Sequence, residues 1–478
     1  MNQNVNSYLA EEKIGKLILK FSIPCIMSLL VSALYNIVDQ IFIGRGIGYL
    51  GNGATNVVFP ITIISLAIAL MIGDGAAAYL SLCQGRNDGK SANKCVGNAV
   101  FLMILFSLII TAIFSIFKIQ ILNAFGATEN NYTYAIEYFN YIVIGIPFFV
   151  FGNGLNSIIR ADGSPKFAMI TTLVGCVINI ILDPVAIFGL DMGMKGAAIA
   201  TITGQIVTAL CGIIYLRKAK SFKITLDSIR PDTSVILKFV PLGISSFLTQ
   251  ISIVVIMGVM NNILVTYGAR SKYGADIPLT VVGIVMKVFQ IVVSICIGIA
   301  AGSQPVIGYN YGAAKYSRVR KIFYTIVKAE TIVGLVAMFL FEVFPLQITS
   351  IFGSEDGLYN EFAVLAFRYF LSMIVLTCLQ KSISVFLQAL GKPIMAMGLS
   401  LLRDFVLSVP FAIVLPMFFG VEGALYSAPA ADLITMVAVV IMSKMMLKEL
   451  KDKSVEESKA FAKTDGAFGK QNPELLIN

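Results

Sequence analysis

Residues 16–43 read KLILKFSIPCIMSLLVSALYNIVDQIFI, an almost unbroken apolar run that carries one acidic residue, Asp39, deep inside it. The hydrocarbon core of a bilayer needs about 20 apolar residues per helix, so this run is long enough to cross a membrane. A carboxylate at such depth costs about 2.5–3.5 kcal/mol on insertion scales. A bound ion, a proton or a charged ligand at Asp39 would offset that cost.

The composition extends this argument to the whole chain. Of its 478 residues, 57% are hydrophobic and only 13% are charged, and the mean hydropathy is +0.84. The apolar runs do not show the alternation over about ten residues that marks a β-barrel strand. We therefore predict an all-α polytopic membrane protein with twelve spans. The predicted spans are 16–43, 53–82, 95–117, 134–159, 167–188, 196–216, 236–266, 278–308, 321–344, 362–388, 395–418 and 422–446.

The basic residues predict the topology. With the N-terminus inside, 26 of the 36 Lys and Arg residues fall on the cytoplasmic side and five on the other. Lys and Arg are enriched in cytoplasmic loops, so both termini are expected in the cytoplasm. This distribution accounts for the net charge of +9 without a nucleic-acid partner. The first ten residues are polar, so we expect no cleavable signal peptide. We expect a monomeric multi-pass protein of the cell membrane.

The chain also contains an internal repeat. Four matches recur in the same order in both halves at offsets of 217–228 residues, and because six spans are an even number, both halves have the same orientation. We predict two six-helix lobes related as parallel repeats by a pseudo-twofold axis along the membrane normal, with the substrate path between them. The predicted segments are a cytoplasmic N-terminus (1–15), a first lobe (16–216), a linker (217–235), a second lobe (236–446) and a disordered cytoplasmic tail (447–478). The matching positions are Lys20, Phe21 and Pro24 with Lys238, Phe239 and Pro241; Gly85 and Lys94 with Gly312 and Lys321; Gly163 and Pro165 with Gly391 and Pro393; and Gly196 with Gly423.

Several motifs in the first half resemble those of the multidrug and toxic compound extrusion (MATE) family. The likeness extends over residues 12–447 and implies two lobes around a central cavity, alternating access, and export of organic cations driven by an inward gradient of H⁺ or Na⁺. The motifs are Pro24 with Asp39-Gln-Ile-Phe-Ile-Gly44, Gln84-Gly85-Arg86, Asn156-Ser-Ile-Ile-Arg160-Ala-Asp-Gly163 and Asn179-Ile-Ile-Leu-Asp183-Pro184.

A set of oxygen-bearing side chains accompanies Asp39. Asn179 precedes Asp183 by four residues and therefore lies on the same helical face. Two carboxylates, two amides and a hydroxyl suit a hard cation, and the same carboxylates could take up a proton. The resemblance to the family implies the same ion-coupling or proton-coupling set, with no other cofactor and no metal besides a possible Na⁺. Its members are Asp39, Asn156, Asn179, Asp183 and Thr201.

The repeat indicates which lobe holds the coupling site. The second-half equivalents of Asp39, Asp183, Asn179 and Asn156 are apolar or small. We therefore expect coupling in the first lobe only. The equivalent residues are Ile256, Phe411, Leu407 and Ser384.

The second lobe has charged residues of its own within predicted spans, and their role stays open between structure and function. We expect its two aspartates to pair with some of the cations, because unpaired charges there are costly. Gln250 and Lys381 stand in regions where some family members carry acids, which argues against a second cation site. The charged residues are Lys287, Lys381, Arg403, Asp404 and Asp432.

Other residues are candidates for the substrate path. Tyr35, Tyr138 and Phe59 could line the cavity, since aromatic faces hold organic cations. Pro24 removes a backbone hydrogen bond fifteen residues before Asp39 and could act as a helix hinge. The resemblance suggests that protonation near Asp39 is coupled to bending at Pro24. Ordinary packing and a static kink are the alternative readings of these residues.

The leading interpretation is a cation-coupled drug exporter, not an enzyme. A flippase for a lipid-linked precursor would use the same architecture with a cationic cavity. An intramembrane enzyme is a remote third reading: the chain has no histidine and no nucleophile motif, which leaves an aspartyl protease built on the Asp pair, and twelve repeated spans are more than such a protease needs. The seven cysteines form no C-x-x-C pair, and we interpret them as small hydrophobes without a metal centre.

Overall fold

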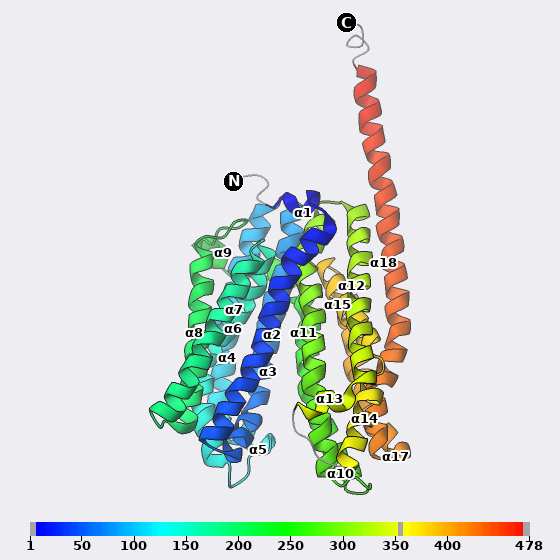
Figure 1. Ribbon diagram of the computed structural model, residues 1–478. Helices are drawn as coiled ribbons and strands as arrows, with labels where there is room; N and C mark the ends of the chain where they lie inside the picture. The colour runs from blue at the N-terminus through cyan, green and yellow to red at the C-terminus, as the bar shows by residue number, and fades with distance from the viewer. Residues whose placement is uncertain (1–5, 352–356, 472–478) are drawn as a thin grey trace.

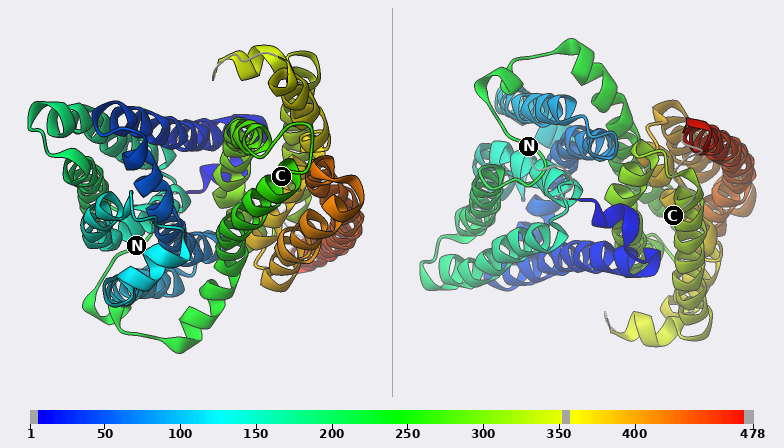
Figure 2. Two further views of the ribbon diagram at one scale, coloured as in Figure 1. Left: turned by 90° about the horizontal axis from the view of Figure 1, so that it is seen from below. Right: turned by 90° about the horizontal axis from the view of Figure 1, so that it is seen from above.

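The computed structural model describes residues 6–351 and 357–471, with side chains as far as Glu456, and this part of the chain folds as helices without strands. Two groups of helices stand side by side, one from each half of the sequence (Figures 1 and 2). Both described ends of the chain lie at the same end of the molecule (Figure 1). The prediction of an all-α, two-lobe protein is confirmed.

The first lobe contains six long helices. A π-helical turn, η1 (Val185–Gly189), extends its fifth span beyond Pro184. The short helices α1 (Tyr8–Glu11) and α5 (Lys118–Ala124) lie outside the spans. The six are α2 (Ile14–Gly46), α3 (Tyr49–Gly85), α4 (Gly89–Ile116), α6 (Tyr132–Ala161), α7 (Pro165–Pro184) and α8 (Gly193–Leu216).

The second lobe repeats this plan with two interrupted spans. Its fourth span is broken between α14 and α15, whose axes differ by 44°. Its fifth contains a longer π-helical segment, η2 (Leu402–Ser408). The short helices α9 (Leu226–Ile229) and α13 (Pro345–Ser350) lie in connections. The other helices are α10 (Thr233–Gly268), α11 (Asp276–Gly312), α12 (Tyr316–Val343), α14 (Leu358–Phe370), α15 (Ile374–Ala389), α16 (Pro393–Leu401), α17 (Val409–Phe419) and α18 (Val421–Gln471).

Ten of the described helices are long and apolar enough to cross a membrane, and the bent pair α14–α15 makes an eleventh span. The twelfth, α12, is less apolar because it carries Lys328 and Glu330 near its middle. It nevertheless packs against α11, α15 and α18. The twelve predicted spans are thus present as helices.

The backbone supports the predicted repeat. Three of the first-half positions with positive φ have a counterpart 227 or 228 residues later that also adopts positive φ. The left-handed conformation is uncommon and marks a specific turn, so its recurrence shows that the two halves turn their chains in the same way. The pairs are Asn87 (φ 55°) with Ala314 (59°), Gly163 (82°) with Gly391 (74°), and Gly193 (53°) with Gly420 (62°).

The lobes contact each other through their first two spans, α2 against α11 and α3 against α10 and α11. The helices of the two lobes approach each other most closely toward the end of the molecule where the described termini lie. A Cβ atom on Gly243 would lie 1.7 Å from the carbonyl oxygen of Met71, and one on Gly75 would lie 2.4 Å from that of Phe239. Only glycine allows backbones to approach so closely.

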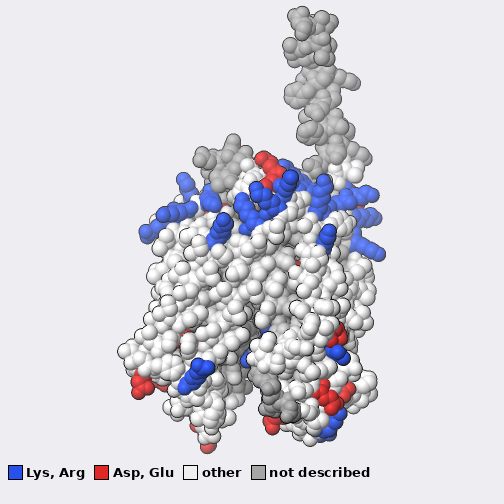
Figure 3. All heavy atoms as spheres, viewed as in Figure 1, with Lys and Arg blue, Asp and Glu red and all other residues white. Residues whose placement is uncertain are grey.

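The opposite end of the molecule is different. Its surface is hollowed between the lobes, whereas Lys and Arg side chains gather at the end where the described termini lie (Figure 3). The lobes are therefore sealed at the basic end and separated at the other.

The linker between the lobes is held against α4. Lys94 pairs with Asp232 at 2.8 Å, and Asn98 donates to the backbone carbonyls of Ser228 and Arg230. Hydrogen bonds from Lys94 and then Ser234 lower the pKa of Asp232 to about 2. The linker therefore adds contacts to the first lobe rather than forming a loose tether.

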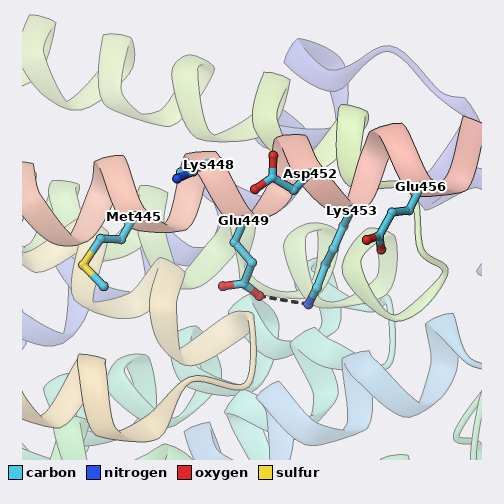
Figure 4. A pocket seen from close by; sticks show the side chains of 6 residues that line it. All are labelled: Met445, Lys448, Glu449, Asp452, Lys453 and Glu456. Atoms are coloured by element: carbon cyan, nitrogen blue, oxygen red, sulfur yellow. Dashed lines mark ion pairs between the residues drawn. The ribbon is translucent and has the colours of Figure 1, made fainter.

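We expected a disordered tail from residue 447 onward, but the structure is helical where this tail begins. Helix α18 continues past residue 447, with Leu450 buried and Lys453 bonded to the Tyr311 hydroxyl at 3.0 Å. The charged residues of this segment form a shallow surface hollow, in which Glu449 and Lys453 pair at 2.9 Å one turn apart (Figure 4). Such an i, i+4 pair adds about 0.2–0.5 kcal/mol to helix stability, and the contacts of Leu450, Lys453 and Glu449 with the second lobe hold the segment in place. Residues 472–478 lie outside the described chain.

The Gly243 contact leads to a test of how the lobes seal. Gly243→Leu should force α10 away from α3. The leucine would collide with the Met71 backbone carbonyl, which cannot move aside as the end of a flexible side chain could. The distance between spin labels at Lys166 and Lys321, one in each lobe, should increase. Gly258→Leu is the matched control on the same helix, since a Cβ there meets nothing within 4 Å. An unchanged distance in the Gly243 variant would contradict the close contact.

Candidate functional site

Three helices of the first lobe bring polar side chains together around Asp39. Asp39 lies on α2, Asn179 and Asp183 on the last turns of α7, and Thr201 on α8. Asp39 is 8% exposed, Asn179 2% and Asp183 0%, so the group is closed off from its surroundings. Helices α7 and α8 approach closely at Gly175, where a Cβ would lie 2.2 Å from Thr208 Oγ1. That approach places Asn179 beside Thr201.

The Asn179 amide connects two of these helices. In the orientation that satisfies both neighbours, its nitrogen donates to Asp183 Oδ2 at 3.3 Å and its oxygen accepts from Thr201 Oγ1 at 3.3 Å. The i, i+4 spacing of Asn179 and Asp183 allows the first bond within α7. Asn179, Asp183 and Thr201 therefore lie together, as the sequence predicts.

The Asp39 and Asp183 carboxyl groups face each other within interaction range. Asp39 Oδ1 is buried and has no hydrogen-bond partner among the described residues. Neither carboxyl has a Lys or Arg partner in the described chain. Two adjacent buried carboxylates repel each other unless one is protonated or a cation lies between them. The arrangement is chemically suited to exchanging a proton or a small hard cation.

Asn156 does not join this group. Its amide nitrogen donates to the Ala168 carbonyl at 2.8 Å and to Thr172 Oγ1 at 3.0 Å, two turns from Asn179 on α7. The second lobe contains the same contact at an offset of 228. There Ser384 bonds to the Ala396 carbonyl at 3.3 Å and to Ser400 Oγ at 3.2 Å.

This equivalence corrects two expectations. The placement of Asn156 with the carboxylates is not what the structure shows, because its amide is used to pack α6 against α7. The second lobe has also not lost its equivalent, since Ser384 retains the packing contact with a shorter side chain. What the second lobe lacks is the group formed by Asp39, Asn179 and Asp183.

The aromatic candidates divide between the buried group and exposed surface. Tyr138 on α6 is 8% exposed and lies close to Asp39, Asp183 and Thr201. Tyr35, one turn before Asp39, also lies near both carboxyls. Phe59 on α3 is 40% exposed and remains a candidate for cavity lining.

Pro24 lies within the continuous helix α2. Ser28 Oγ donates to its carbonyl at 2.9 Å, so a side chain reinforces the turn at this position. The helix is not broken here, and a hinge at Pro24 remains a prediction.

The predicted pairing of second-lobe charges is confirmed for four of the five residues. Arg403 joins Asp404 and Asp432, each at 2.9 Å, and Lys381 pairs with Asp404 at 3.2 Å. Thr377 donates to the remaining oxygen of Asp432 at 2.5 Å. Two cations thus meet two anions in a buried, neutral network. Lys287 is exposed and forms no ion pair with the described residues.

A family model described as MatE matches residues 24–185 and 246–414, more than half of the chain. The chain belongs to the MatE family. One matched segment falls in each lobe, in agreement with the repeat. Membership in this family of membrane transporters confirms the expectation of a transporter and not an enzyme.

MatE relatives and structures match along nearly the whole chain. The Multidrug export protein MepA of Staphylococcus saprophyticus is 25% identical over 450 residues, covering 93% of this chain and 96% of that protein. The MepA of Staphylococcus haemolyticus is 27% identical over 436 residues, covering 89% and 92%. An outward-facing multidrug resistance MATE family transporter of the MOP superfamily has a TM-score of 0.87 at 23% identity, covering 94% of this chain and 100% of that one. A crystal structure of MATE in complex with MaL6 has a TM-score of 0.86 at 23% identity, covering 94% and 99%.

Sequence reasoning overlooked a polar group that joins the two MatE lobes. Asp74 on α3 accepts hydrogen bonds from Ser157 at 2.6 Å and from Ser246 of the other lobe at 2.9 Å. Arg160 is buried and lies 3.5 Å from Asp74. Gln388 of the second lobe donates to Ser246 at 3.4 Å. We call Asp74, Ser157, Arg160, Ser246 and Gln388 the interlobe cluster.

A signal for this cluster was present in the sequence. Asp74 lies inside the second predicted span, and the cost argument that singled out Asp39 applies equally to it. Glu330 in the ninth predicted span was overlooked in the same way.

The buried charge network of the second lobe can be tested by breaking it. Arg403→Met removes the cation shared by two buried carboxylates, which should lower the free energy of unfolding by about 3–5 kcal/mol. Thermal unfolding in detergent would measure this. Lys272→Met is the control, because the Lys272–Glu361 pair is 58% and 47% exposed and such pairs contribute about 1 kcal/mol or less. Equal stability of the two variants would contradict the network's role.

The interlobe cluster offers a second test with a neighbouring control. Ser246→Ala removes the bond to Asp74 that crosses between the lobes, a bond to a charged group worth about 1.5–3 kcal/mol. The population with the lobes sealed at the basic end should fall, as seen in the spin-label distances described above. Ser245→Ala should have no such effect, because Ser245 Oγ bonds only within its own helix, to Leu242.

Proposed function

We propose that this chain is a secondary active antiporter that exports cationic or other amphiphilic small molecules, driven by inward flow of H⁺ or Na⁺. The observation that carries this proposal is the pair of facing, buried carboxyl groups of Asp39 and Asp183, one oxygen of which has no donor. The names of the relatives, which are multidrug export proteins, support the substrate class.

The mechanism begins at the carboxyl pair. A proton shared between Asp39 and Asp183, or Na⁺ held by their oxygens with Asn179 and Thr201, relieves the repulsion between the two acids. The ion therefore changes how strongly α2 is held against α7. Because α2 also packs on α11 of the other lobe, binding or release of the ion at Asp39 changes the position of α2 at the lobe interface. Alternating access then consists of opening and sealing the two ends in turn.

The orientation is part of the proposal. The basic end is assigned to the cytoplasm, because Lys and Arg favour that side. Both described termini lie at that end (Figure 1), and the hollow between the lobes lies at the other (Figure 3). The structure would then correspond to an outward-open state that has released its substrate. The protein acts as a monomer in the cell membrane, without a nucleic-acid partner.

The charge balance of the second lobe favours an exporter over a lipid-linked precursor flippase. A flippase of that kind needs a strongly cationic cavity to hold a pyrophosphate-bearing substrate. Lys381 and Arg403 are neutralised by Asp404 and Asp432. Lys287 is the only second-lobe candidate among these cations that remains unpaired in the described chain.

The test is transport by the purified protein in liposomes under an imposed pH or Na⁺ gradient, with a panel of organic cations. Wild-type protein should concentrate some of them with one of the two gradients, which identifies the coupling ion. Asp39→Asn and Asp183→Asn should each reduce gradient-driven transport to the rate of protein-free liposomes while the protein still folds. Asp191→Asn makes the same substitution at an exposed loop position and should transport normally.

Two results would overturn the proposal. Gradient-driven transport retained in both aspartate variants would remove the coupling site. Absence of transport for every cation, together with transfer of a lipid-linked precursor across the bilayer, would favour the flippase.

A further inference from the structure

Three buried side chains of the second lobe converge at a place that the proposed transport cycle does not use. Cys296 on α11, Glu330 on α12 and Cys378 on α15 place two sulfurs and a carboxylate oxygen within 4.8 Å of one another. Their exposed fractions are 1%, 0% and 2%. The three residues come from three different helices, so the cluster is a product of the tertiary fold.

The carboxylate is oriented by a neighbour and left with one unused oxygen. Ser382, one turn after Cys378 on α15, donates to Glu330 Oε1. Glu330 Oε2 is buried without a hydrogen-bond partner among the described residues. A buried carboxylate oxygen without a donor is costly. A ligand at the cysteine sulfurs would remove that cost.

The donor set identifies the chemical class of the ligand. Two thiolates and one carboxylate suit Zn²⁺ and similar borderline-soft divalent ions, whereas Mg²⁺ and Ca²⁺ prefer all-oxygen ligands. Ligands about 2.3 Å from a tetrahedral zinc ion lie about 3.8 Å apart. The cluster would therefore need to contract by about 1 Å or less to hold one ion.

We propose that Cys296, Cys378 and Glu330 form a binding site for a zinc-class divalent cation, with Ser382 positioning the carboxylate. Each thiol releases its proton when the ion binds, so two thiolates and the Glu330 carboxylate carry three negative charges against the two positive charges of the ion. The hydrogen bond from Ser382 to Glu330 Oε1 stabilises the remaining negative charge. Three protein ligands leave a fourth position open. The ion would join α11, α12 and α15 in the core of the second lobe. The site is separate from Asp39 and Asp183, and the proposal does not depend on the coupling mechanism.

The experiment measures the metal itself. The full chain would be produced in cells grown with added zinc, purified in detergent with its tag removed, and analysed for metal by mass spectrometry. The chain contains no histidine to compete for the ion. We expect about one zinc ion per chain. A cobalt-loaded sample should show thiolate-to-cobalt charge-transfer absorption, and a chelator should remove the ion and lower the unfolding temperature.

Matched variants assign the ligands. Cys296→Ser and Cys378→Ser should each reduce bound zinc to near background, and Glu330→Gln should weaken binding at least about tenfold. Cys95→Ser is the control, because Cys95 is equally buried in the first lobe with its sulfur near the Ala76 carbonyl.

Two outcomes would overturn the proposal. One is zinc content unchanged in both cysteine variants. The other is wild-type protein without bound zinc, whether its intact mass shows free thiols or a Cys296–Cys378 disulfide. Because the second outcome is measured on the wild-type chain, a variant that fails to fold does not leave the question open.

Discussion

Placing a charge in the apolar interior of a membrane costs several kcal/mol unless it is paired, protonated or hydrated. That constraint explains how the buried charged groups of Asp74, Arg160 and the second-lobe network are arranged. The cations Lys381 and Arg403 meet Asp404 and Asp432, and their charges cancel. Arg160 lies beside Asp74. Within the described chain, Asp39 and Asp183 have no basic partner and lie beside each other and neutral side chains, and this excess of acid makes them suited to a mobile ion.

Much of the architecture could be predicted from the amino-acid sequence alone. Apolar runs of span length predicted the helices, and matches at offsets near 227 predicted the repeat that the backbone turns at Asn87 and Ala314 display. The i, i+4 spacing predicted that Asn179 and Asp183 would lie on the same helical face. These features depend on local periodicity or on comparison of the chain with itself.

Other features depend on which helices become neighbours, and the sequence does not contain that information in a readable form. Asn156 carries the right chemistry for the carboxylate group, but the packing of α6 on α7 uses its amide at Ala168 and Thr172. Cys296 and Cys378 lie 82 residues apart, and only the packing of α11 against α15 brings them to Glu330. The bend of 44° between α14 and α15 was likewise invisible in an apolar run.

The close approach at Gly243 has a consequence for how the two lobes can separate. The surfaces in contact there are main-chain atoms, and each helix already satisfies its own carbonyl groups. Parting the helices at this point strips few polar atoms of partners. Beside it, Phe21 of the first lobe and Phe239 and Leu242 of the second pack their side chains into the core of the other lobe. The hydrogen bonds that join the lobes beside this contact end at one residue: Ser246 donates to the Asp74 carboxylate, and Gln304 donates to the Asp74 backbone carbonyl at 3.5 Å. Small polar substitutions beside this contact can therefore shift the balance between sealed and separated lobes without altering the ion site or the surface that meets the substrate.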